Sequence, residues 1–231
     1  MAQDPVVHLS ASRRVSARQR NRRRLIDAAK QLASMRGYEA ATLREVAALA
    51  GLTTGAVFAN FADKADLFAA AIEADDEALL AVMRRAADAD ADGGPRRTLL
   101  AMLAAVQARQ QEELAWVRVK MSLIWCCAGR RAIGARTIEA ALAEVLRDRV
   151  RTGALAGHAD PELLADMVWE SYLSNCRRAV FDGWSSGRLR QRLAASVEAI
   201  LDGYEVRPVL AAASWPPNAR AAGSPPRALR G

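Results

Sequence analysis

The sequence predicts an all-α protein in which an N-terminal three-helix domain with a helix-turn-helix is followed by a larger helical domain. Alanine and arginine are frequent, aromatic residues make up 5% of the chain, and no segment alternates strictly between apolar and polar residues. This composition favours helices over strands. Apolar residues also recur at helical spacing, and 231 residues are enough for one small and one larger domain.

The first helix is expected to run from Arg18 to Arg36. Its apolar residues recur every three or four positions, at Leu25, Ala28, Ala29, Leu32 and Met35. The helix should end at Gly37-Tyr38, because a glycine closes a helix in the left-handed conformation and the next apolar residue folds back on it.

Residues 42–64 predict the helix-turn-helix itself. Thr42 and Glu45 have the spacing of a capping box, so a helix should begin at once after Thr42. Gly51 is expected to form the turn, since glycine enters the left-handed conformation without steric cost. Thr53 should cap a second helix over residues 54–60. The inward positions are Val46, Ala47, Ala50, Leu52 and Val57. Such a pair places its second helix in the major groove of DNA.

The remaining chain divides at caps, glycines and prolines. Asp63 is expected to cap a long helix that extends to about Arg85. Further helices are expected over residues 97–113, 114–127, 135–151, 161–182 and 188–204. We therefore expect a disordered arginine-rich arm (1–17), a helix-turn-helix domain (18–62), a connecting helix (63–86), a larger helical domain (95–204) and a disordered tail (205–231).

Positive charge is concentrated at the N-terminus. The chain has a formal net charge of +7, and residues 1–24 hold seven arginines against Asp4 alone. A charge run of this kind is often only a solvated tail. Because it directly precedes a helix-turn-helix, we favour an arm that neutralises DNA phosphates or enters the minor groove, with Arg18 and Arg22 among its contacts.

These features together resemble the tetracycline-repressor (TetR) family of bacterial transcriptional regulators. The matching residues lie in the first third of the chain and are Leu25, Ala29, Gly37, Tyr38, Thr42, Val46, Ala47, Gly51, Phe58, Phe61, Lys64 and Leu67. The resemblance implies double-stranded operator DNA as a partner. It also implies a small-molecule effector that binds in the larger domain, and a homodimer formed by the last two long helices. Leu189, Leu193, Val197, Ile200 and Leu201 supply an apolar stripe that suits the dimer.

The same resemblance implies which residues meet DNA. Thr42, Asn60 and Lys64 match phosphate-binding positions, and Arg44 matches a position from which arginine reaches guanine. Phe58 replaces the usual tyrosine, so we expect it to keep the packing and to lose a hydroxyl contact. The expected DNA-binding residues are Thr42, Arg44, Thr53, Thr54, Gly55, Ala56, Phe58, Asn60, Lys64, Arg18 and Arg22.

A mainly apolar effector is expected between the helices at 114–127 and 161–182. The candidate wall residues are Trp116, Lys120, Met121, Trp125, Trp169 and Tyr172, although ordinary core packing also accounts for each of them. Lys120 interrupts an apolar helix. It should reach solvent, pair with an acid such as Glu170, or anchor an anionic ligand.

Other classes of function are less well supported. The three cysteines (Cys126, Cys127 and Cys176) and the lack of a signal peptide or long apolar run favour a reducing cytoplasm, with buried roles favoured over redox sensing. No nucleophile, metal or phosphate-binding motif indicates an enzyme, and we expect no cofactor. The sequence thus predicts a dimeric repressor released from DNA by an effector. The alternative is an architectural or constitutive DNA-binding dimer without an effector.

Overall fold

The computed structural model describes residues 5–126 and 134–206, with side chains over 16–123 and 137–206. Within these ranges the chain forms α-helices and no strand. The helices are α1 (Pro5–Arg36), α2 (Leu43–Leu49), α3 (Thr54–Phe58), α4 (Lys64–Ala89), α5 (Pro95–Glu112), α6 (Leu114–Cys126), α7 (Gly134–Arg151), α8 (Pro161–Phe181) and α9 (Ser186–Leu201). None of them is long and apolar enough to cross a membrane.

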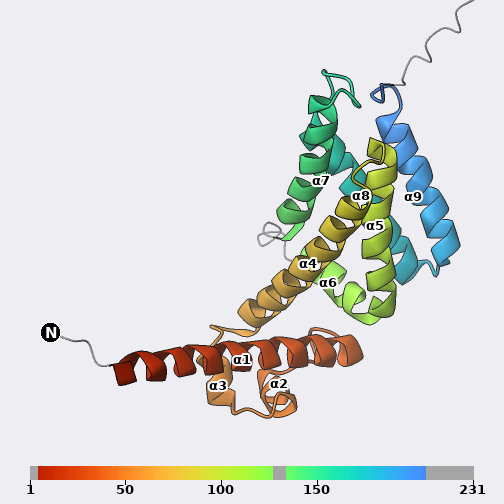
Figure 1. Cartoon of the computed structure of the whole chain (residues 1–231). Coiled ribbons are helices and arrows are strands. Elements are labelled where there is room, and N and C mark those ends of the chain that lie inside the picture. Colours follow the sequence, from red (N-terminus) through yellow and green to blue (C-terminus); the bar gives the residue numbers. More distant parts are fainter. Residues whose placement is uncertain (1–4, 127–133, 207–231) are drawn as a thin grey trace, which may run out of the picture.

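The helices form two groups, and α4 connects them. Helix α1 lies across one end of the molecule with α2 and α3 against it, and α4 rises from this group into the larger bundle of α5 to α9 (Figure 1). The predicted all-α fold, with a helix-turn-helix at its N-terminus, is confirmed.

Each group has its own core. The N-terminal core collects most of the predicted inward residues of α1, α2 and α3 around Phe61, Leu67 and Phe68, but Leu52 is only partly buried and Met35 is 69% exposed, contrary to expectation. The larger core lies among α4, α5, α7, α8 and α9 and contains Trp169 and Tyr172. Helix α6 contributes to both, because it packs against α1 on one side and against α8 on the other.

Helix α1 begins at Pro5, thirteen residues before the expected start at Arg18. Residues 5–17 therefore extend the helix, where we had expected a disordered arm. Proline is well tolerated in the first turn of a helix, and no glycine or proline interrupts residues 6–36. Arg13 and Arg14 fall within this extension, but their side chains lie outside the described residues.

The end of the larger domain also differs from expectation. Helix α9 ends at Leu201 rather than at residue 204, because Gly203 turns the chain with a φ of +87°. Glu205 then bridges to Leu155, and the Val206 amide donates to the Ala154 carbonyl at 3.1 Å. Residues 205 and 206 are thus paired with the α7–α8 loop. The rest of the expected tail lies outside the described residues.

The apolar stripe of α9 packs inside its own chain. Leu193, Val197 and Leu201 are buried in the larger core, and Leu189 is buried beside the cavity. The expectation that this stripe meets a second subunit is therefore wrong. A helix at the edge of a bundle must first bury one apolar face within its own domain, and sequence periodicity alone does not separate that face from a dimer face.

Candidate DNA-binding surface and effector cavity

The start of α2 is fixed by the capping box predicted from the sequence. The Thr42 hydroxyl accepts a hydrogen bond from the Glu45 amide at 3.2 Å, and the Glu45 carboxylate accepts one from the Thr42 amide at 3.2 Å. The hydroxyl also donates to this carboxylate at 2.7 Å, and this bond lowers the pKa of Glu45 most. The hydroxyl proton that a DNA phosphate would accept is therefore already donated to Glu45.

The turn between α2 and α3 depends on Gly51. Its φ is +63°, and a Cβ at this position would lie 2.9 Å from a guanidinium nitrogen of Arg24. The Leu52 amide donates to the Ala47 carbonyl at 2.9 Å, which closes the turn. The Thr53 hydroxyl then caps α3 by accepting from the Ala56 amide at 3.3 Å. Both helices are thus set by local signals in the sequence.

One face of this unit is exposed. Arg44, Thr54 and Gly55 are exposed, whereas the neighbouring Val57 is buried. Phe58 is 59% exposed, so the expectation that it keeps an internal packing role is wrong. Successive helical residues differ by about 100° in direction, and Val57 already takes the inward position. An exposed phenyl ring can instead contact a thymine methyl group.

Arg18 and Arg22 hold the end of α3. The Arg18 guanidinium donates to the Ala59 carbonyl at 3.1 Å, and that of Arg22 donates to the Asn60 carbonyl at 3.2 Å. Arg22 also lies over the Phe61 ring, 4.5 Å from its centre. Both residues, expected to contact DNA, therefore connect α1 to α3. Each guanidinium has five N–H donors, so donors remain for a phosphate.

Asn60 and Lys64 are also engaged within the domain. The Asn60 side-chain amide donates to the Ala56 carbonyl at 2.7 Å. The Lys64 ammonium donates to the Glu39 carbonyl at 3.1 Å and lies 4.3 Å from the centre of the Tyr38 ring. Both side chains were expected to reach a phosphate. In this structure they stabilise α3 and the α1–α2 turn.

Trp116 does not lie in the larger domain's core. It is buried with Val119 in the N-terminal core, and the Lys30 ammonium lies 5.6 Å from the centre of its ring. Met121, five residues further along α6, faces the larger core instead. The two residues were expected to line the same pocket. They lie on different faces of α6 because that helix packs between two cores.

Lys120 is 7% exposed and lies in a cluster of five charged side chains. Its ammonium contacts the Asp76 carboxylate and lies 3.0 Å from that of Asp75. Lys30 lies 3.0 Å from Asp75 and also contacts Glu113. This ion cluster (Lys30, Asp75, Asp76, Glu113 and Lys120) joins α1, α4, the middle of α6 and the residue that precedes α6. Of the three expected roles of Lys120, the structure shows pairing with an acid, and the partners are Asp75 and Asp76 of α4 in place of Glu170.

The pKa values in the cluster follow from burial and shared charges. Burial acts to raise the pKa of Asp75, but the ammonium groups of Lys120 and Lys30 outweigh it and the pKa is lowered. Asp76 has only Lys120, so burial keeps its pKa raised. Burial acts to lower the pKa of Lys120, and the two carboxylates outweigh it. Of the two aspartates, Asp76 therefore takes up a proton first as the pH falls.

The larger domain contains a small cavity among α5, α6, α8 and α9. Its volume is about 20 Å³, enough for one water. Its lining residues are Gln107, Gln110, Gln111, Leu114, Val117, Tyr172, Asn175, Cys176, Ala179 and Leu189. Of the expected ligand residues only Tyr172 lines it. Trp169 stacks on Tyr172 with ring centres 5.1 Å apart, and the Trp125 side chain lies outside the described residues.

Sequence reasoning missed the glutamines of this cavity. The Tyr172 hydroxyl and the Cys176 thiol both donate to the Gln110 side-chain oxygen, at 2.8 and 3.2 Å. Gln107 follows Leu99, Met102, Leu103 and Val106 on the buried face of α5. A glutamine at a position that helical spacing reserves for an apolar residue was the available signal.

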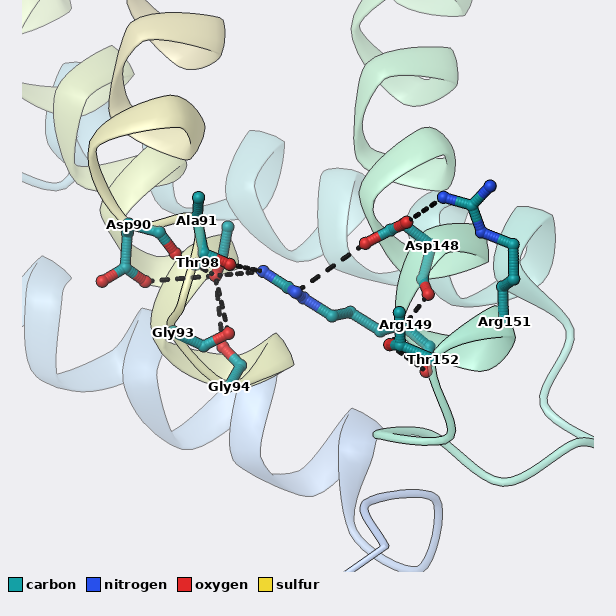
Figure 2. A network of polar contacts seen from close by, with 9 residues as sticks. All are labelled: Asp90, Ala91, Gly93, Gly94, Thr98, Asp148, Arg149, Arg151 and Thr152. Atoms are coloured by element: carbon teal, nitrogen blue, oxygen red, sulfur yellow. Dashed lines mark hydrogen bonds and ion pairs between the residues drawn. The ribbon is translucent and has the colours of Figure 1, made fainter.

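The far end of α4 is tied to α7 by a polar network (Figure 2). The Arg149 guanidinium donates to the Ala91 carbonyl at 2.8 Å and reaches the Thr98 hydroxyl at 3.5 Å. That hydroxyl also lies 3.1 Å from the Asp90 carboxylate. The end of α4 that is remote from the helix-turn-helix is therefore fixed to the larger domain.

Comparisons with known proteins agree with this architecture. Residues 25–71 match the family model described as bacterial regulatory proteins, tetR family. No curated protein sequence matches the chain. A TetR-family regulator from Mesorhizobium loti has a similar structure, with a TM-score of 0.66 and 21% identity over 82% of this chain and 98% of that one. A transcriptional regulator from Rhodococcus sp. Rha1 is also similar, with a TM-score of 0.68 and 25% identity over 81% of this chain and 99% of that one.

A third similar structure is SmeT, the repressor of the Stenotrophomonas maltophilia multidrug efflux pump SmeDEF. Its TM-score is 0.64, with 23% identity over 81% of this chain and 91% of SmeT. A complex of SmeT with triclosan also matches, with a TM-score of 0.63 and 22% identity over 81% of this chain and 93% of that one. The chain thus has the two-domain helical fold of these regulators. Its N-terminal domain is a TetR-family domain, so the resemblance seen in the sequence is confirmed.

Proposed function

We propose that the protein is a dimeric, sequence-specific DNA-binding repressor that a small-molecule effector releases from its operator. The observation that carries the proposal is the exposed face of a correctly capped helix-turn-helix in a TetR-family domain. Arg44, Thr54, Gly55 and Phe58 are all exposed. Val46, Ala47, Ala50 and Val57 are buried and hold the unit on the rest of its domain. An arginine on such a face can make a bidentate contact to guanine.

A dimer is supported by exposed apolar residues on α8. Leu163, Met167 and Phe181 are all about half exposed. Met167 and Phe181 are separated by close to four helical turns, so they lie on one face of the helix. An apolar face on one of the last two long helices suits a twofold interface, and a dimer would present two α3 helices to two half-sites.

Release by an effector is supported by the position of α6. This helix borders the cavity on one side and contacts α1 on the other. The ion cluster links α6 and the residue that precedes it to α1 and α4, and the far end of α4 is held on α7. A ligand that displaced α6 would therefore move α1 and the near end of α4 relative to the fixed end. A coupling of about 1–3 kcal/mol would change operator affinity about five- to 150-fold.

The proposal is tested by selecting bound sequences from a pool of random duplex DNA. We expect enrichment of a motif with twofold symmetry whose half-sites lie about one helical turn apart. Placing the selected operator upstream of a reporter gene should lower its expression when the protein is present. Binding without any enriched motif would contradict sequence-specific recognition, and increased expression would contradict repression.

The second candidate is a constitutive or architectural DNA-binding dimer. The cavity that Tyr172 lines has a volume of about 20 Å³, and this favours the alternative because a drug-sized pocket has about 300–1,000 Å³. Clefts of about 410 Å³ beside α6 and about 650 Å³ between α4 and α7 lie elsewhere. Operator binding in the presence of a library of small apolar molecules separates the two functions. A repressor with an effector loses affinity for the operator with some members of the library, whereas a constitutive binder responds to none.

A further inference from the structure

Among the residues that the structure describes, no charged side chain lines the cavity beside Tyr172. Its polar groups are the carboxamides of Gln107, Gln110, Gln111 and Asn175, with the Tyr172 hydroxyl and the Cys176 thiol. Burial raises the pKa of the Tyr172 hydroxyl well above its usual value and that of the Cys176 thiol to about 12. Both groups are therefore neutral at physiological pH, and the whole lining is neutral.

Gln107 carries an unused pair of hydrogen-bonding groups. The residue is 9% exposed, and both its side-chain nitrogen and its side-chain oxygen are buried without a hydrogen-bond partner. Its neighbour Gln110 differs, because the Gln110 oxygen accepts from Tyr172 and Cys176. A buried donor or acceptor without a partner is costly, because it has lost its hydrogen bond to water. The Gln107 carboxamide is thus buried beside the cavity with both its nitrogen and its oxygen unpaired, whereas the accessible wall of the cavity is almost entirely apolar.

We infer that this cavity is the closed form of the effector site, and that its ligand is neutral, mainly apolar and carries an adjacent donor and acceptor that pair with the Gln107 carboxamide. A carboxamide, a lactam or a urea has this arrangement. The inference rests on the proposed function, because it names the chemical class of the effector for that same regulator.

Charged ligands fit this site poorly. An anion or a cation placed among neutral side chains would lose its hydration without gaining an opposite charge. Lys120 was the residue expected to anchor an anionic ligand, but its ammonium group is already paired with Asp75 and Asp76. The surrounding helices therefore select against a free carboxylate or amine at this position.

The ligand must open the cavity, and α6 is the side that can yield. Leu114 lines the cavity from the first residue of α6 and is 41% exposed, so it borders solvent. Glu113 precedes it and contacts Lys30 of α1. A ligand that separates Leu114 from Tyr172 and pairs with Gln107 would move the segment that carries Glu113. The bound state is thereby linked to the position of α1.

Three matched probes test the chemical class on the full-length protein: 1-naphthaleneacetamide, 1-naphthaleneacetate and methyl 1-naphthaleneacetate. The first has a donor and an acceptor, the second a negative charge, and the third only an acceptor. By isothermal titration calorimetry at pH 7 we expect the amide to bind at least about ten times more tightly than the carboxylate and several times more tightly than the ester, from net contributions of about 0.5–1.5 kcal/mol per hydrogen bond.

Variants then assign the preference to one residue. Gln107→Met keeps the length of the side chain and removes both polar atoms, so we expect it to weaken amide binding about tenfold and ester binding much less. Gln191→Met is the matched control, because Gln191 is exposed on α9, and it should bind all three probes as the parent does.

Several outcomes would overturn the inference. They are equal binding of the three probes, unchanged amide preference in Gln107→Met, or no binding of any probe. In the last case a single water or a filled core accounts for the cavity. Operator binding is measured on the same samples. A protein that binds its operator but shows no amide preference refutes this inference alone, whereas loss of sequence-specific DNA binding refutes the proposed function.

Discussion

Replacing Lys120 with methionine tests whether the ion cluster holds the two domains together. Lys120 is buried and is the one cation among the described residues that contacts Asp76, whereas Asp75 retains Lys30 at 3.0 Å. The variant would therefore leave one buried carboxylate uncompensated. Removing one partner of a buried ion pair costs about 3–5 kcal/mol, so we expect a loss of that size in the free energy of unfolding at pH 7.

A second substitution should restore much of this loss. Asp76→Asn in the Lys120→Met background removes the uncompensated charge, and we expect it to recover about 2–3 kcal/mol of the 3–5 kcal/mol lost. Asp88→Asn in the same background is the control, because Asp88 is exposed on α4. Urea unfolding, followed by circular dichroism at a fixed protein concentration, measures all of these variants.

The loss should also depend on pH. Burial raises the pKa of Asp76 in the folded protein, and in Lys120→Met no ammonium group opposes this shift. A group with a raised folded pKa contributes stability at low pH and loses that contribution as the pH rises through the folded pKa. The difference between Lys120→Met and the parent should therefore shrink from pH 7 to pH 5. An equal difference at both pH values, or equal recovery by Asp88→Asn, would show that the buried charge of Asp76 is not the cause of the loss.

Three further changes test the helix-turn-helix and its flanking helix. Gly51→Ala should cost at least about 1 kcal/mol of unfolding free energy in thermal or urea denaturation, because its φ is +63° and the new methyl group would meet Arg24; an unchanged stability contradicts this. Arg22→Ala should loosen α3 and lower affinity for all DNA sequences alike in fluorescence anisotropy, since its guanidinium holds the Asn60 carbonyl, and a changed sequence preference would contradict it. Deleting residues 1–17 should lower the slope of log K against log salt by up to about two per subunit, and an unchanged slope means that this part of α1 does not contact phosphates.

Local signals allowed the N-terminal domain to be predicted closely. The capping box at Thr42, the turn at Gly51 and the cap at Thr53 each depend on residues within five positions of one another. Interactions of this range are visible in the sequence as spacing. The same applies to α8, which begins with the Asp160 cap and Pro161 as expected. The start of α1 was missed because its helix-forming residues continue past the apolar pattern to Pro5.

The effector site could not be predicted in the same way, because it depends on which faces of helices meet. Trp116 and Met121 lie on one helix, but each joins a different core. The partners of Lys120 come from α4, more than forty residues earlier in the sequence, and no local pattern links them. Exposure of Phe58 likewise depends on Val57 and Phe61 having taken the inward positions. Tertiary packing determines the surroundings of these residues, and helical spacing alone does not predict how helices pack.

We propose that the exposed surface of α2 and α3 reads DNA bases, and binding selection with two variants tests this proposal. The parent should enrich a motif with twofold symmetry. Arg44→Ala should lose the preference at one base pair in each half-site, a discrimination of about 1–3 kcal/mol. Lys64→Ala should weaken binding while keeping the motif, since Lys64 contacts the Glu39 carbonyl and the Tyr38 ring. A motif that Arg44→Ala leaves unchanged would contradict the proposal.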